Sequence, residues 1–129
     1  MGELTSTAMN SAPGQLDPAA IENLRAINPD DGGEFLRELV DIFLADTPQH
    51  LGAIESAIAA GDAPTLTRAA HSIKGSAGNF GANHLAALAR DIEALGKSGE
   101  LTAVALALPG LRAEFGRVKP ALEQLKLGS

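Results

Sequence analysis

The chain has no cysteine, tryptophan or tyrosine, and four phenylalanines are its only aromatic residues. Without cysteine, the protein can form no disulfide, no thiolate nucleophile and no cysteine-ligated metal centre. Hydrophobic residues make up 45% of the chain, whereas aromatic residues make up only 3%. Sheet proteins favour aromatic and β-branched residues, so this composition favours helices that pack closely through alanine and leucine.

Positive charge is also scarce, with 10 lysines and arginines against 16 aspartates and glutamates and a formal charge of −6. No basic stripe is present to neutralise phosphates, which argues against a nucleic-acid partner. No apolar run approaches the roughly 18 residues of a membrane span, and the N-terminus lacks the basic start and apolar core of a signal peptide. We therefore expect a cytoplasmic monomer that contacts neither nucleic acid nor a membrane.

The length of 129 residues allows one domain with a genuine core. Residues 1–16 are rich in serine, threonine, glycine and alanine, and we predict that they form a disordered leader. We place the folded domain at residues 17–127. Asp17 is the expected N-cap of a short first helix, with Pro18 at its first position.

Four further segments carry apolar residues at helical spacing. The spacing predicts helices over 34–60, from Asp62 to a stop at Gly81, over 82–97, and along a seam from Leu101 to Leu125. The connections between these helices are short, so we predict an all-α fold. It is an antiparallel up-down-up-down four-helix bundle with a short extra N-terminal helix.

Prolines interrupt two of these predicted helices. Pro48 is expected to bend the helix over 34–60 or loosen one of its turns, because its ring removes an N–H and crowds a carbonyl. Pro109 and Pro120 lie within the last seam, together with two glycines. For that segment we expect either a kinked helix or two collinear pieces.

The segment "AAHSIKGSAGNFGA" (69–82) places His71 among glycines in a stretch that otherwise predicts helix. At about 100° per residue, His71 lies roughly 140° from the apolar stripe and therefore faces solvent. Gly75 and Gly78 lie within about 40° of His71, and Lys74 lies within about 60°. Each glycine weakens the helix by roughly 0.5–1 kcal/mol relative to alanine. We infer that the glycines let something large approach the imidazole, and that Lys74 supplies positive charge there.

An accessible neutral imidazole is a good nucleophile near neutral pH. A phosphoryl group placed on His71 would be nearly dianionic, and Lys74 could screen that charge without a metal ion. The sequence contains no P-loop, no Ser-His-Asp order and no carboxylate cluster for magnesium. If His71 is phosphorylated, the catalyst lies on another protein.

The run "AAHSIKGSAGNFGANHLAALARDIEAL" closely resembles the histidine-containing phosphotransfer (HPt) domain of phosphorelays. The upstream segment "EFLRELVDIFLADTPQHLGAIESAIAAGD" also resembles that family's preceding helix. The characteristic pattern is an Ala-His pair, a hydrophobic residue, Lys-Gly, then Gly-Ala, Leu and a Leu/Ile-Glu pair. In this chain it is met by Ala70, His71, Ile73, Lys74, Gly75, Gly81, Ala82, Leu85, Ile92 and Glu93. The resemblance covers about 100 residues.

The resemblance implies that His71 accepts a phosphoryl group from an aspartate of one receiver domain and passes it to another receiver. The protein is then a phosphoryl carrier rather than an enzyme, and its partners are the receiver domains of response regulators or hybrid histidine kinases. It needs no cofactor of its own, because the receiver brings the magnesium ion. Lys74 matches the lysine that contacts the phosphoryl oxygens, and Gly75 matches the glycine that lets the receiver dock. We expect Gly78 and Arg68 to border the same docking surface.

Glu93 is a further candidate. If the helices on either side of Gly81 fold back on each other, Glu93 lies within one turn of His71. The corresponding family position often carries Gln or Glu bonded to the histidine. We therefore predict that Glu93 accepts a hydrogen bond from Nδ1–H of His71, which fixes the tautomer and leaves Nε2 free to attack.

Two alternatives remain open from the sequence. The chain could be an HPt piece of a hybrid sensor kinase or a domain that takes phosphate from an ATP-binding kinase domain. It could also be an interaction module that docks a receiver without phosphotransfer. His50 and His84 are expected to be exposed to solvent, and we predict no metal site among the three histidines. Arg90 could add to the positive charge near His71, although a solvated arginine is the simpler interpretation.

Overall fold

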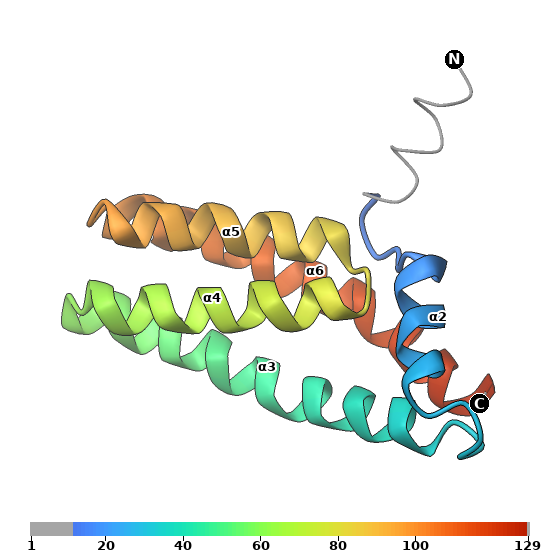
Figure 1. Cartoon of the computed structure of the whole chain (residues 1–129). Coiled ribbons are helices and arrows are strands. Elements are labelled where there is room, and N and C mark those ends of the chain that lie inside the picture. The colour runs from blue at the N-terminus through green and yellow to red at the C-terminus, as the bar shows by residue number, and fades with distance from the viewer. Residues whose placement is uncertain (1–11, 129) are drawn as a thin grey trace.

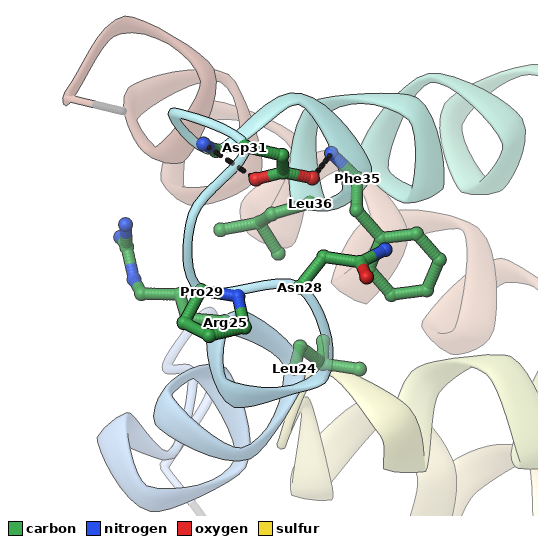
Figure 2. A pocket seen from close by; sticks show the side chains of 8 residues that line it. Leu24, Arg25, Asn28, Pro29, Asp31, Phe35 and Leu36 are labelled. Carbon is green, nitrogen blue, oxygen red and sulfur yellow. Dashed lines mark hydrogen bonds between the residues drawn. The ribbon is translucent and has the colours of Figure 1, made fainter.

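The structure is a computed structural model that describes residues 12–128. The first described helix, α2, spans Pro18–Ile27, and the side chain of its N-cap Asp17 accepts a hydrogen bond from the N–H of Ala19, as predicted. A loop then leads to α3, Glu34–Ala60. In this loop the Asp31 carboxylate accepts hydrogen bonds from the N–H groups of Gly33 and Phe35, both at 2.9 Å (Figure 2). Asp31 therefore satisfies donors at the start of α3 that the helix itself leaves unpaired.

The predicted boundaries of the remaining helices hold to within a residue or two at most positions. α4 spans Ala63–Asn79, α5 spans Asn83–Lys97, and α6 spans Leu101–Gly128. Gly61 ends α3 in the left-handed conformation (φ 69°), and Asp62 caps α4 through the N–H of Thr65. Gly81, with φ 67°, turns the chain between α4 and α5. These are the positions where glycine and aspartate are favoured for their backbone geometry and capping oxygen.

The four long helices form a bundle in which successive helices run in opposite directions (Figure 1). The neighbouring pairs are α3 with α4, α4 with α5, α5 with α6, and α3 with α6, which closes the ring. The short helix α2 lies across the end of the bundle where α4 turns into α5 (Figure 1). Here the N–H of Asp17 donates to the carbonyl of Gly81 at 2.9 Å. The predicted all-α architecture is confirmed.

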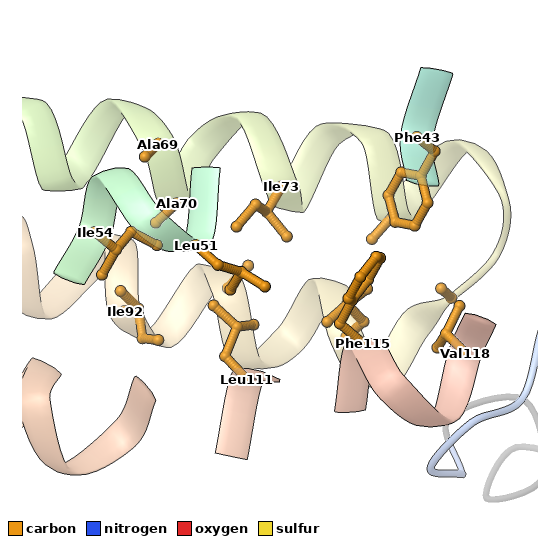
Figure 3. Close-up of a cluster of buried hydrophobic side chains, with 14 of the residues drawn as sticks. Phe43, Leu51, Ile54, Ala69, Ala70, Ile73, Ile92, Leu111, Phe115 and Val118 are labelled. Atoms are coloured by element: carbon orange, nitrogen blue, oxygen red, sulfur yellow. The ribbon is translucent and has the colours of Figure 1, made fainter. Parts of the chain in front are cut away.

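The apolar stripes meet in one core, shown in part in Figure 3. On α4 the apolar residues at helical spacing, Leu66, Ala70, Ile73 and Ala77, are all buried, and on α6 the seam is buried from Val104 to Leu122. The rings of Phe80 and Phe115 both pack against Phe43, with centroids 5.4 and 5.9 Å away. On α5 the buried face is rotated slightly from the stripe that the helical spacing predicts, which consists of Leu85, Leu88, Ile92 and Leu95. Leu88 and Leu95 are only partly buried, whereas the buried residues of this helix are Leu85, Ala89, Ile92, Glu93 and Gly96.

The prolines do not divide the helices that contain them. α3 continues through Pro48, and α6 is one helix through Pro109 and Pro120. Of the two alternatives expected for this segment, a kinked helix or two collinear pieces, the second is therefore excluded. All three prolines lie on exposed positions. The missing N–H groups therefore fall on the solvent side, while the buried stripe of each helix keeps its packing and its register.

Residues 1–11 of the predicted leader lie outside the described residues. Residues 12–16 are placed beside α6, where the N–H of Gly14 donates to Oε2 of Glu114 at 2.7 Å. Glu114 is fully buried and also accepts a hydrogen bond from Nε of Arg117 at 2.8 Å. Within residues 12–128, no helix combines the length and the apolar character that crossing a membrane requires.

Candidate functional site

α4 presents His71 to solvent while its opposite face is anchored in the core. Ala70 and Ile73, which flank His71 in the chain, are completely buried. The side chain of His71 is 64% exposed. This follows from the helical repeat, because residues about 140° from a buried stripe lie on the outer surface of the bundle.

The surface beside His71 is bare backbone. A Cβ atom added at Gly75 or Gly78 would have no atom within 4 Å, so neither glycine is there to let a neighbouring helix approach. Neither has a positive φ. Neither the backbone conformation nor a packing contact of the described chain thus requires glycine at these positions. Because glycine has no side chain, the space next to the imidazole is open.

The α4–α5 turn at Gly81 brings Glu93 directly against His71. Nδ1 of His71 lies 2.8 Å from Oε2 of Glu93. The second carboxylate oxygen, Oε1, lies 2.7 Å from Nζ of Lys74. The Glu93 side chain is only 7% exposed, whereas that of Lys74 is 33% exposed. One buried carboxylate on α5 therefore holds both the imidazole and the ammonium of α4.

Electrostatic interactions in this cluster determine which ring nitrogen of His71 carries the proton. The hydrogen bond from the Lys74 ammonium holds the pKa of the Glu93 carboxyl at about 2, below its ordinary 4.5. Burial opposes this shift in pKa, and the contact with His71 adds to it. An ionised carboxylate only accepts hydrogen bonds, so Nδ1 of His71 must be the donor. In the neutral imidazole, Nε2 then carries the free lone pair.

Lys97 joins the cluster and was not singled out from the sequence. Its Nζ lies 3.6 Å from Oε2 of Glu93, and its side chain is 67% exposed. The signal was available, because Lys97 follows Glu93 by four residues and therefore lies on the same face of α5. From the sequence, Glu93 was paired with His71 alone.

The other predicted rim residues are not in direct contact with His71. Arg68 lies one turn earlier on α4, where its Nη2 donates to Oγ1 of Thr65 at 3.3 Å. Arg90 lies on α5 and borders an open groove of about 380 Å³ together with Lys74. Two alanines and Asn83 complete its lining. The α4–α5 face beside His71 therefore carries basic side chains although the chain as a whole is acidic.

The remaining histidines lie apart from this cluster. His50, on α3, and His84, in the first turn of α5, are half-buried rather than exposed to solvent as expected. Among residues 12–128, no group of three or more histidine, aspartate or glutamate side chains is placed to hold a metal ion.

Comparisons with known proteins agree with this architecture. The family model of the Hpt domain matches residues 38–126. The crystal structure of histidine-containing phosphotransfer protein B (HptB) from Pseudomonas aeruginosa PAO1 superposes with a TM-score of 0.79 at 30% sequence identity. The match covers 88% of this chain and 96% of that one. No curated protein sequence matches.

The matched residues span α3 to α6 and include the whole cluster around His71. The chain therefore belongs to the Hpt domain family, whose members serve histidine phosphotransfer in phosphorelays.

Proposed function

We propose that this protein carries phosphoryl groups on Nε2 of His71, accepting them from an aspartate of one receiver domain and passing them to another. One observation carries the proposal. A single exposed imidazole is hydrogen-bonded through Nδ1 to a buried carboxylate and stands beside bare helix backbone at Gly75 and Gly78. A histidine with only a surface role needs neither the buried partner nor the cleared surface.

The transfer step uses the proton arrangement described above. The Nε2 lone pair attacks the phosphorus atom of the receiver's aspartyl phosphate, an N–P bond forms, the O–P bond breaks, and the aspartate leaves as a carboxylate. The proton stays on Nδ1, so the ring gains positive charge during the attack. Glu93, at 2.8 Å from Nδ1, faces that charge and stabilises it. Onward transfer reverses these steps.

Lys74 is the candidate for the charge that develops on the phosphoryl oxygens. It follows His71 by three residues and lies on the same side of α4. Its ammonium is held by Glu93 at 2.7 Å and its side chain is one-third exposed, so the ammonium can turn outward to a group on His71. We expect the magnesium ion and the acidic pocket for the reaction to come from the receiver.

The docking surface extends from the glycines onto α3. At about 100° per residue, the order around α4 is Lys74, Gly78, His71, Gly75 and then Asn79. Asn79 borders a shallow groove with Ile42 and other residues of α3, and Ile42 is 55% exposed. A receiver seated over Gly75 would thus meet the apolar side chain of Ile42 together with Asp46 on the α3 side, and basic side chains on the α5 side. The basic side suits the acidic aspartyl pocket of a receiver.

Incubation with receivers that carry labelled phosphate tests the proposal. The label is expected to move to this chain at a site that is labile in acid and stable in base, and to be absent from His71→Gln. A receiver that binds the chain but keeps its label would instead support an inert docking module.

Glu93 is tested in the same assay with Glu93→Ala and Glu93→Gln. We expect the alanine variant to slow transfer more, because the amide of glutamine can still accept from Nδ1–H. Nitrogen-15 NMR of the imidazole reports the tautomer independently. If the alanine variant keeps both the tautomer and the transfer rate, Glu93 has no part in the mechanism.

A further inference from the structure

The two oxygens of the Glu93 carboxylate are used unequally. Oε1 contacts one cation, Lys74, at 2.7 Å, whereas Oε2 is shared between Nδ1 of His71 at 2.8 Å and Nζ of Lys97 at 3.6 Å. Within residues 12–128, the charged or titratable groups that contact Glu93 are His71 and Lys74 from α4 and Lys97 from α5. α6 also packs on α5 but contributes no such group.

In the unphosphorylated site Lys97 is nearly redundant. Its ammonium is beyond hydrogen-bond distance, and its side chain is two-thirds exposed. An ammonium that is largely solvated and beyond hydrogen-bond distance adds little to the stability of an ion pair. Lys74, which is closer and half as exposed, already supplies the counter-charge that Glu93 needs.

Phosphorylation changes this balance. If Lys74 turns toward the phosphoryl oxygens, Oε1 loses the partner that lowers the pKa of the Glu93 carboxyl most. A carboxylate that is only 7% exposed is costly to leave without a counter-ion, so it would tend to take up a proton. A protonated Glu93 no longer stabilises the positive charge on the ring of His71.

We propose that Lys97 is a reserve counter-ion for Glu93, which closes on the carboxylate when Lys74 turns to the phosphoryl group on His71. Lys97 is a positioning residue, since it acts on His71 only through Glu93. Its long exposed side chain and its place one helical turn after Glu93 allow the short movement from 3.6 Å to hydrogen-bond distance. The inference rests on the proposed phosphotransfer at His71.

The experiment compares transfer rates in four proteins: the wild type, Lys74→Gln, Lys97→Gln and the double variant. Lys119→Gln, at an exposed position of α6, is the matched control for loss of one surface lysine. We expect Lys97→Gln alone to slow uptake of the phosphoryl group about twofold or less, because Lys74 still holds Glu93 in the unphosphorylated site. In the Lys74→Gln background the same change should slow transfer about tenfold, because Glu93 then has no cation left.

The dependence of the transfer rate on pH provides a second measurement. It would not change if Lys97 had only a structural role. In Lys97→Gln the loss of onward transfer on the acid side should begin at higher pH than in the wild type, because Glu93 takes up a proton more readily. Lys97→Arg should restore the wild-type profile, and Lys119→Gln should leave it unchanged.

Two results would overturn the inference: rate losses that simply multiply in the double variant, or an acid limb that does not move in Lys97→Gln. Both leave transfer to His71 intact in the wild type. Failure of the proposed function itself would look different, because the wild type would take up no label or His71→Gln would still be labelled.

Discussion

Replacing Gly75 with alanine should make this protein more stable and less active. The residue lies in the interior of α4 with an ordinary helical backbone, and an added Cβ would meet no atom within 4 Å. The substitution thus brings the helix preference of alanine without a clash, which is a gain of about 0.5–1 kcal/mol in the free energy of unfolding. For a domain of this size, that gain corresponds to a rise in Tm of about 2–5 °C.

The same methyl group should hinder a docked receiver. If the receiver backbone or side chains approach the bare helix beside His71, an extra carbon at the contact costs about 1–2 kcal/mol, which is about 5- to 30-fold in transfer rate. Urea or thermal unfolding measures the first effect, and single-turnover transfer from a phosphorylated receiver measures the second. Gly116→Ala is the matched control. It lies at an exposed, open position of α6, so it should stabilise the fold similarly and leave transfer unchanged.

The possible outcomes distinguish the effect of Gly75→Ala on stability from its effect on receiver docking. A Gly75→Ala protein that is less stable than the wild type would contradict the open surface that the structure shows on α4. A protein that is more stable but transfers at the wild-type rate would show that Gly75 does not serve receiver access. An equal loss of transfer in Gly116→Ala would mean that added helix stability, rather than a blocked surface, slows the reaction.

Three further predictions follow from buried contacts. Because the folded-state pKa of Glu93 is about 2 against an ordinary 4.5, the unfolded chain binds more protons in that interval, so the free energy of unfolding should fall as pH drops from about 4.5 toward 2. Glu93→Gln should weaken this dependence in urea titrations at several pH values, and an unchanged slope would contradict the ion pairing. Glu114→Ala should lower the free energy of unfolding by about 1–3 kcal/mol, since it removes the acceptor of the Gly14 N–H, and a loss below 0.5 kcal/mol (about the effect of an ordinary surface change) would refute that role. Gly96→Ala should destabilise the protein by about 1–3 kcal/mol, the opposite sign to Gly75, because its Cβ would lie 2.5 Å from Oγ1 of Thr67. Thermal unfolding checks this, and a rise in Tm would contradict the close contact of α4 with α5.

Much of the fold was predictable because its signals are local. The apolar stripe of α4 follows the helical repeat, and Gly61 with Asp62 ends one helix and caps the next through backbone geometry and a side-chain oxygen. The exposure of His71 follows from the same repeat. The continuity of α6 through Pro109 and Pro120 did not follow, because local propensity favours a break and only the packing of the whole seam decides against it.

Buried polar residues are a second feature that the sequence alone does not predict. Glu114 lies on the apolar seam of α6, three residues after Leu111, but its burial makes sense only once the Gly14 backbone and Arg117 are seen against it. A glutamate in a sequence is by default a surface residue, since burial of its charge needs partners. One of those partners, Gly14, lies 100 residues away from Glu114 in the chain.

The sequence by itself determined the helical bundle, the outward direction of His71 and the cleared surface at Gly75, because periodicity and glycine placement act within one helix. Only the tertiary structure decided that a single carboxylate, Glu93, is shared by His71, Lys74 and Lys97. That sharing depends on the offset and rotation of α5 against α4 about Gly81. A shift of about one ångström in this offset would break the hydrogen bonds of Glu93, and no pattern within one helix specifies the offset.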